Sequence, residues 1–420
     1  MVSVAERRRL GERLHAFVSV FDPPLGGGSG PTVAIKDLID VAGVPTGGGG
    51  VHALDPSPAR NATVVQRLLD AGYQAVGKTH TVELAFGGWG TNRAVGAPWN
   101  PWDAKVHRAP GGSSSGSAVA VATGLCDVAL GTDTGGSVRI PAAASGVVGL
   151  KPSRGLVSTR GVHDLAPSLD TVGVLARSVA GAARALAVIS GPDEGFSVRG
   201  PFDAAAALGS SVDGWRVAAI PVAAIPDIHP EIAAHYEVAL GKLAALGVSV
   251  EEARTPRPFS DYFQPNGWLM AAEGWRVRGA HIQAHGADMD PWVRKRFEGG
   301  REVSDAELAQ ALARRAADQA EFQAWMAPYH ALLSPTSPIP APSIDEVDET
   351  ASPFSAMTRA GNYLDLSALN LPIGLTSTGL PIGFQVMGRT ADETSAVALA
   401  AALEKVSGWN GRMPDLSGFS

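Results

Sequence analysis

The sequence predicts an α/β protein built on a central mixed β-sheet with helices on both faces. Residues 215–253 alternate between an apolar segment, an amphipathic segment closed by a glycine and a second apolar segment, which indicates a strand, a helix and a strand. Residues 117–125 are apolar on every side of a helix, and a short buried strand is predicted directly after them, at 127–131. This alternation is typical of a sheet that helices cover on both faces.

Further elements follow the same pattern along the chain. An apolar run from Thr32 to Lys36 predicts a buried strand, a helix is expected over 61–72, and a strand begins at 75. Ser304 and Glu307 have the spacing of a capping box, so the longest helix is expected to start at Ser304 and to end near Pro328.

The chain is expected to form one domain. Its 420 residues, 45% of them hydrophobic, are enough for a large core, and neither a long repeat nor a clear linker interrupts them. We expect a single domain over 1–420, with a core at about 30–190, a variable substrate-side region at about 196–330 and a C-terminal return to the sheet at about 331–420.

Composition excludes several classes of function. The net charge is −7 and the only arginine run is Arg7 to Arg9, so no basic patch for nucleic acid is visible. With Cys126 as the single cysteine, disulfides within the chain and cysteine-based zinc sites are excluded, and we expect neither a metal nor a cofactor. Since no signal sequence or long apolar stretch is visible, a cytoplasmic protein without membrane contact is expected. A homodimer is compatible with the sequence, which leaves the oligomeric state open.

Two Gly-Gly-Ser segments stand on either side of one predicted helix and one predicted strand. Ser113 lies in the first segment, "PGGSSSGSAVAVATG", and Ser137 lies 24 residues later in the second, "GTDTGGSVRIPAAASG". The helix rises about 16 Å and a five-residue strand returns about the same distance. Both serines are therefore expected at the same edge of the sheet.

Lys36 ends its buried strand, and the alternation of side chains along a strand turns the neighbouring Asp37 to the opposite face. Burial without a paired carboxylate lowers the pKa of a lysine. A neutral Lys36 could then accept a proton.

Two other interpretations of these motifs are disfavoured. The G-x-S-x-G pattern centred on Ser114 requires a strand directly before it, whereas the preceding "DAKVHRAPGG" is polar and turn-like. Residues 72–79 match the phosphate-binding pattern G-x-x-x-x-G-K-T, but the middle of this match is predicted to be a strand rather than a loop.

The turn before Ser137 provides backbone donors. Gly135 and Gly136 carry no side chains that would block their N–H groups, and Pro141 indicates a helix that starts soon afterwards. Consecutive N–H groups at such a strand-to-helix turn can form an oxyanion hole, beside which a nucleophile is expected.

These segments, together with "VAIKDLIDVAG" and "GVVGLKPS", resemble the amidase signature family, and the similarity continues through "DPWVRKRFEGG", "LLSPTSPIPAP" and "LPIGFQVMGR". The resemblance implies the single-domain amidase-signature fold and a Ser-cis-Ser-Lys triad. Ser137 would be the nucleophile, Ser113 a bridging serine with a cis peptide bond, and Lys36 the base. The implied oxyanion donors are the N–H groups of Thr134, Gly135, Gly136 and Ser137.

Other residues are given supporting roles. Ser114, Asp133 and Arg139 match family positions, and we expect them to hold the loops by hydrogen bonds. Candidate walls of the substrate pocket, chosen because they lie near the motifs or the C-terminal loops, are Phe86, Trp89 and Tyr363. Ser115 and Ser145 replace a frequent glycine and a frequent cysteine of the family, and the region before Lys36 is shorter than usual.

The sequence thus predicts a serine amidohydrolase that cleaves a small carboxamide to a carboxylate and ammonia or an amine through an acyl-enzyme. Two alternatives stay open. One is the glutamine-amide-hydrolysing subunit of a tRNA amidotransferase, which would need partner subunits and tRNA contacts. The other is a catalytically silent binding protein on the same scaffold.

Overall fold

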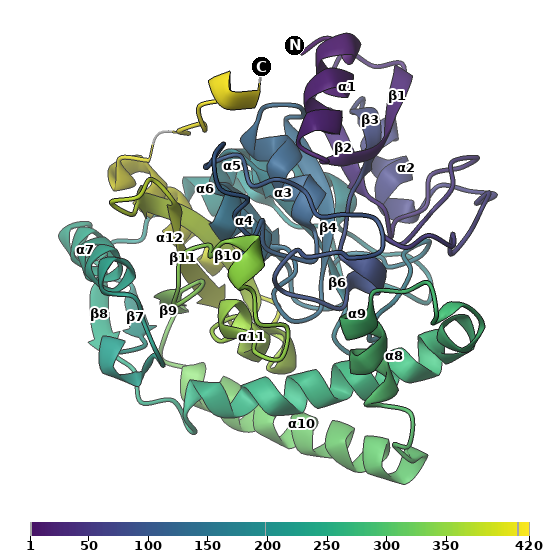
Figure 1. Cartoon of the computed structure of the whole chain (residues 1–420). Helices are drawn as coiled ribbons and strands as arrows, with labels where there is room; N and C mark the ends of the chain where they lie inside the picture. Colours follow the sequence, from purple (N-terminus) through teal and green to yellow (C-terminus); the bar gives the residue numbers. More distant parts are fainter. Residues whose placement is uncertain (1, 198, 410, 420) are drawn as a thin grey trace.

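The computed structural model describes residues 2–197, 199–409 and 411–419. Within them, eleven strands form one sheet in the order β1-β3-β2-β4-β6-β5-β10-β11-β9-β7-β8, which lies at the centre of the molecule (Figure 1). The strands are β1 (Phe17–Leu25), β2 (Thr32–Lys36), β3 (Gln74–Thr79), β4 (Val128–Asp133), β5 (Val148–Lys151), β6 (Thr171–Ala176), β7 (Arg216–Ala219), β8 (Ser249–Glu252), β9 (Ala331–Pro335), β10 (Ser367–Leu375) and β11 (Pro381–Gly388).

The sheet is mixed, as the sequence predicts. β2 pairs in parallel with β3 and β4, and β7 pairs in parallel with β8 and β9, whereas the neighbouring pairs β4/β6, β5/β6, β5/β10, β10/β11 and β9/β11 are antiparallel. Strands from the core, the variable region and the C-terminal return all enter this one sheet. The strand, helix and strand predicted over residues 215–253 are β7, α7 and β8.

Helices cover both faces, which confirms the predicted fold class. The described α-helices are α1 (Val4–Arg13), α2 (Thr63–Asp70), α3 (Ser115–Ala122), α4 (Arg139–Ser145), α5 (Val179–Ile189), α6 (Ala204–Gly209), α7 (Pro230–Ala245), α8 (Phe263–His285), α9 (Pro291–Glu298), α10 (Asp305–Met326), α11 (Arg359–Tyr363) and α12 (Glu393–Ser407). Side chains of α2, α5, α6, α7 and α12 share a hydrophobic core with Val33 and Ile35 of β2. Side chains of α1, α3 and α4 share another core with Ala34.

The alternation along β2 decides which layer Lys36 faces. All five residues of this strand are buried, and Ala34, two residues before Lys36, packs against the layer that contains α3. Because side chains two residues apart lie on the same face of a strand, Lys36 is directed toward the segment that begins α3. Asp37 turns the other way and forms a buried ion pair with Lys78, with 3.0 Å between Oδ1 and Nζ.

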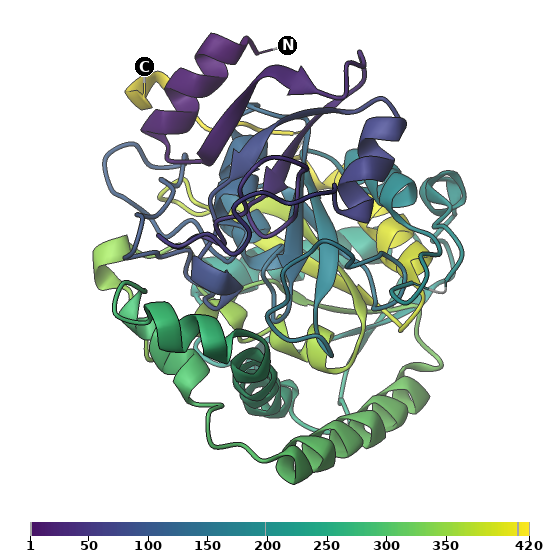
Figure 2. The same ribbon diagram turned by 90° about the vertical axis from the view of Figure 1, so that its right-hand side faces the viewer.

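The variable region places two long helices at one end of the molecule (Figures 1 and 2). The predicted capping box is present: the Ser304 side chain accepts from the Glu307 N–H at the start of α10. The prediction that this would be the longest helix is wrong, because α8 has 23 residues and α10 has 22 within the described chain. The glycines of α8 look like helix breaks in the sequence, so this helix was not predicted. Gly274 is required at its position because a Cβ there would lie 2.7 Å from the Phe297 ring.

The length and hydropathy of each helix indicate whether it could cross a membrane. In the described part of the chain, none of the helices combines the length and the apolar character needed to cross a membrane.

Candidate active site

Three segments bring Lys36, Ser113 and Ser137 to one edge of the sheet. Lys36 is the last residue of β2, Ser113 lies just before α3, and Ser137 lies in the turn between β4 and α4. Lys36 Nζ donates to Ser113 Oγ at 2.7 Å and to Thr132 Oγ1 at 2.8 Å. Lys36 and Ser113 have no solvent exposure. Two hydroxyl groups, one of them that of Ser113, therefore hold the lysine in a position that solvent does not reach.

This environment changes the protonation of Lys36. Burial lowers the pKa of Lys36 to about 7, against the opposing effects of the Asp133 and Asp170 charges. Asp37, the carboxylate nearest in sequence, is paired with Lys78 on the other face. A substantial fraction of Lys36 is therefore the neutral amine near neutral pH, in direct contact with Ser113.

Backbone contacts position Ser113. The peptide bond between Gly112 and Ser113 is cis. The carbonyl of Ser113 accepts from the Val82 N–H at 3.1 Å and from Thr81 Oγ1 at 3.0 Å, and the Ser114 N–H donates to the Ser137 carbonyl at 3.1 Å. The loop that carries Ser113 is thereby attached to the turn that carries Ser137.

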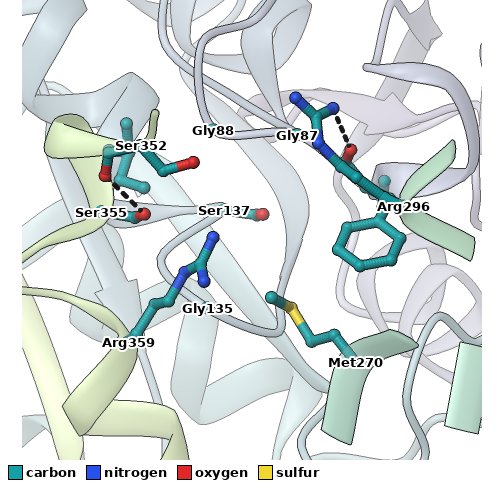
Figure 3. Close-up of a pocket in the computed structure, with 12 residues that line it drawn as sticks. Gly87, Gly88, Gly135, Ser137, Met270, Arg296, Ser352, Ser355 and Arg359 are labelled. Atoms are coloured by element: carbon teal, nitrogen blue, oxygen red, sulfur yellow. Dashed lines mark hydrogen bonds between the residues drawn. The ribbon is translucent and has the colours of Figure 1, made fainter. Parts of the chain in front are cut away.

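Ser137 faces a cavity rather than the protein interior. Within the described chain, no hydrogen bond joins its Oγ to that of Ser113, although the Ser114 contact holds the two segments together. Figure 3 shows the Ser137 hydroxyl pointing into the pocket between Arg359 and Arg296. Catalytic hydrogen bonds are often long or unformed before a substrate is bound.

Asp133 and Arg139 organise the turn that holds Ser137. Asp133 accepts from the N–H groups of Gly136 at 2.8 Å and Val138 at 3.0 Å, and it forms two hydrogen bonds with the Arg139 guanidinium at 3.0 and 2.9 Å. Burial by itself would raise the pKa of Asp133, but the Arg139 charge and these hydrogen bonds hold it well below its usual range. Both side chains are fully buried.

We expect replacement of Arg139 by methionine to lower the free energy of unfolding by about 3–5 kcal/mol, because it leaves Asp133 as a buried, unpaired charge. Arg139 also donates to the Thr358 carbonyl, Asn362 Oδ1 and Gln385 Oε1, so the variant loses contacts to the C-terminal region as well. A urea titration measures the shift. The matched control is Arg8→Met, which removes an exposed pair with Asp22 and should leave the midpoint unchanged; equal midpoints for Arg139→Met and the native chain would contradict the role given to this pair.

The predicted oxyanion donors are not equivalent. The Gly136 N–H is already bonded to Asp133, so we remove it from the predicted set. Gly135 and Ser137 line the pocket, while Thr134 does not line it and donates its hydroxyl to Asp170 at 2.5 Å. The N–H groups of Gly135 and Ser137 remain the candidates for contact with a substrate oxygen.

The pocket in front of Ser137 is small and adjoins a wider cavity. The inner pocket has a volume of about 30 Å³ and is lined by Ala85, Phe86, Gly87, Gly88, Gly135, Ser137, Ile140, Met270, Arg296, Ser352, Ser355 and Arg359. It shares Phe86, Arg296, Ser352 and Arg359 with an outer cavity of about 560 Å³. The inner space is therefore confined, whereas the outer cavity beside it is much larger.

Of the three aromatic residues predicted as pocket walls, only Phe86 lines this pocket. Trp89 packs against Phe354, and its Nε1 donates to the carbonyls of Asp348 and Ala351. Tyr363 is buried, and its hydroxyl donates to Asp318 at 3.0 Å. The predictions for Trp89 and Tyr363 are therefore corrected: proximity in sequence to the motifs did not place them at the site.

Several residues of the site were missed in the sequence. Thr132, which contacts Lys36, could have been found from its place in the strand before Ser137, whereas three residues of the pocket wall gave no signal. Met270 and Arg359 belong to α8 and α11, distant from the motifs, and Arg296 lies within "DPWVRKRFEGG" without any spacing that indicates a site. Among the described residues, no group of three or more His, Cys, Asp or Glu side chains is arranged to hold a metal ion.

The structure agrees with the rejection of the two competing motifs. Residues 74–79 form β3, so the match to a phosphate-binding loop is extended, and its lysine, Lys78, is buried against Asp37. No strand stands directly before Ser114 in the described chain, as a G-x-S-x-G elbow would require.

Comparison with known proteins places this chain in a family. Residues 23–397 match the family model described as Amidase. The chain is 36% identical to 2-amino-5-chloromuconic acid deaminase of Comamonas testosteroni, over 91% of this chain and 83% of that protein. It is 35% identical to one subunit of the glutamyl-tRNA(Gln) amidotransferase of Symbiobacterium thermophilum, over 97% of this chain and 88% of the relative.

Solved structures agree. The structure of 6-aminohexanoate cyclic dimer hydrolase superposes with a TM-score of 0.88 at 26% identity, covering 99% of this chain and 96% of that one. The corresponding glutamyl-tRNA(Gln) amidotransferase subunit from Thermotoga maritima superposes with a TM-score of 0.83 at 32% identity, covering 98% and 95%. The protein, with its mixed sheet and its paired Gly-Gly-Ser turns, is therefore an enzyme of the amidase family.

Proposed function

We propose that this enzyme hydrolyses a small carboxamide through an acyl-enzyme on Ser137. The observation that carries the proposal is the contact of 2.7 Å between Ser113 and a fully buried Lys36 whose pKa is lowered to about 7. A neutral amine in this position can take the Ser113 proton while Ser113 takes the proton of Ser137. Ser137 then attacks the amide carbonyl.

The same relay serves the later steps. As the tetrahedral intermediate forms, its oxygen can accept from the N–H groups of Gly135 and Ser137, which line the pocket. Protonated Lys36 returns its proton through Ser113 to the leaving nitrogen, the C–N bond breaks to leave the acyl group on Ser137, and water then hydrolyses the acyl-enzyme. The products are a carboxylate and ammonia or an amine.

The size of the pocket favours a small substrate. The confined space of about 30 Å³ beside Ser137 favours a slender reacting end, and the remainder of the substrate would occupy the outer cavity. Phe86 and Met270 provide apolar contacts near the reacting carbon. A primary or short secondary carboxamide fits this shape.

A second candidate function is the glutamine-hydrolysing subunit of a tRNA amidotransferase. It is favoured by the 35% identity to such a subunit over nearly the whole chain. This function needs partner subunits, so it predicts that glutamine hydrolysis depends on proteins that co-purify with the chain. A catalytically silent binding protein is disfavoured by the Lys36–Ser113 contact, which a binding role does not require.

The purified chain is expected to release ammonia from small carboxamides without a partner. A panel of aliphatic and aryl amides that includes glutamine, with ammonia as the readout, tests this directly. Release from glutamine only after co-expression with partner subunits would replace our proposal by the second candidate. Absence of release under both conditions would favour the silent binding protein.

A further inference from the structure

Arg359, the first residue of α11, lies in the pocket wall and forms no ion pair with an acidic residue of the described chain. It lines both the inner pocket and the outer cavity. Within the described chain, its guanidinium has no carboxylate within 4.0 Å and no hydrogen-bond acceptor, and it stacks on the Phe263 ring, with the centroid 3.9 Å from Cζ. Stacking on an aromatic ring orients a guanidinium but leaves its N–H groups free.

The other arginines close to this pocket are satisfied. Arg296 forms an ion pair with Glu349 at 2.5 Å and donates to the Phe86 carbonyl at 2.9 Å. Arg139 is bonded to Asp133. Arg359 is only half-buried and lines the pocket, so its free N–H groups are open to a partner that enters with the substrate.

Arg359 lies beside the turn that carries Ser137. A Cβ built on Gly135 would lie 3.4 Å from Arg359 Cγ, so the side chain runs beside the turn that offers the oxyanion donors. A Cβ on Gly267 of α8 would lie 2.7 Å from Nη1, so this glycine leaves room for the guanidinium. Figure 3 shows the guanidinium directed toward Ser137.

The electrostatics of the pocket favour an anion. Its described inner lining contains Arg296 and Arg359 and no acidic residue, and the acid of the outer cavity, Glu349, is paired with Arg296. Burial and the Arg296 charge lower the pKa of Arg359 to about 9, so the group stays cationic at neutral pH. An anion bound here would offset the desolvation of that charge.

We propose that Arg359 binds a carboxylate on the acyl portion of the substrate, so that the enzyme selects carboxamides of short dicarboxylic acids and related acids over neutral amides. This inference rests on the proposed amide hydrolysis and names its substrate class. A planar guanidinium can hold a carboxylate through two parallel hydrogen bonds, which fixes the amide carbon relative to Ser137.

The test compares substrates that differ only in charge. Succinamate and glutaramate are paired with 4-methylpentanamide and 5-methylhexanamide, in which an isopropyl group replaces the carboxylate. We expect kcat/KM of the native enzyme to be about 100-fold higher for the acids, and Arg359→Met to reduce this ratio to about one. Arg359→Lys, which keeps the charge without the planar fork, should retain part of the preference.

The matched control is Arg254→Met, which removes the charge of an exposed arginine and should keep the native ratio. If the native enzyme cleaves both members of a pair equally, or if Arg359→Met cleaves the amides with the native ratio, the carboxylate site is wrong while the proposed function stands. A melting temperature for each variant separates these outcomes from misfolding.

If the native enzyme cleaves none of these amides, the proposed function fails in this range of substrates. The carboxylate site is then tested by a binding measurement instead of by kinetics. Calorimetric titration with succinate is then expected to show binding to the native chain that Arg359→Met lacks. Equal binding to both proteins, or binding to neither, would overturn the inference.

Discussion

The Ser137→Ala enzyme is expected to lose amide hydrolysis by a factor of about 10⁴–10⁶, because Ser137 is the one described hydroxyl residue that both lines this pocket and is hydrogen-bonded through its backbone to the segment that carries Ser113. Ser352 and Ser355 line the pocket from the opposite loop, without contact to the Lys36 relay. Ammonia release measures the loss. A fluorophosphonate probe gives a second readout, since it should label the native enzyme and not the variant.

Ser115→Ala is the matched control for this experiment. Ser115 belongs to the same serine-rich run, but its buried hydroxyl has no hydrogen-bond partner among the described residues. Its removal should leave both labelling and turnover intact. If Ser137→Ala were labelled as strongly as the native enzyme, the nucleophile would have to be another residue.

The Lys36→Met enzyme is expected to lose acylation by a factor of about 10²–10⁴, the contribution typical of a positioned general base. Methionine has a similar volume and no proton-accepting nitrogen, so Ser113 loses the group that takes its proton. Since burial already works against the charged form of this lysine, the variant should be at least as stable as the native chain. Single-turnover kinetics together with a melting curve separate a catalytic loss from a folding defect.

The pH dependence of the native enzyme follows from the same group. Lys36 acts as a base only when neutral, and its pKa is lowered to about 7. As the pH falls below about 7 the protonated fraction grows, so kcat/KM should fall about tenfold for each further unit. Lys36→Met should lack this limb. A variant with near-normal turnover at pH 7, or with an unchanged acid limb, would show that another group is the base.

Much of the fold was accessible from local patterns. The buried run at Thr32–Lys36, the capping box at Ser304 and the alternation over 215–253 each describe interactions between residues close in sequence, and all three predictions are confirmed. Helix α8 was missed because its glycines look like breaks in a helix. In the folded chain, Gly274 is the residue that allows the Phe297 ring to approach.

What the sequence determined by itself is the placement of three candidate residues at one edge of the sheet, and the resemblance to the amidase signature family supplied their proposed roles. Side-chain alternation separates Lys36 from Asp37, and one helix and one strand between the two Gly-Gly-Ser turns return Ser137 to the neighbourhood of Ser113. These relations depend on element lengths and periodicity alone.

Only the tertiary structure decided the walls of the pocket and the direction of each donor. The Gly136 N–H is turned to Asp133, and Trp89 and Tyr363 are held away from the site by their own hydrogen bonds. Arg359 enters through α11 and stacks on Phe263, so that a guanidinium without a partner faces Ser137. Such contacts join residues far apart in the chain, and packing between helices and loops, which no local pattern encodes, determines them.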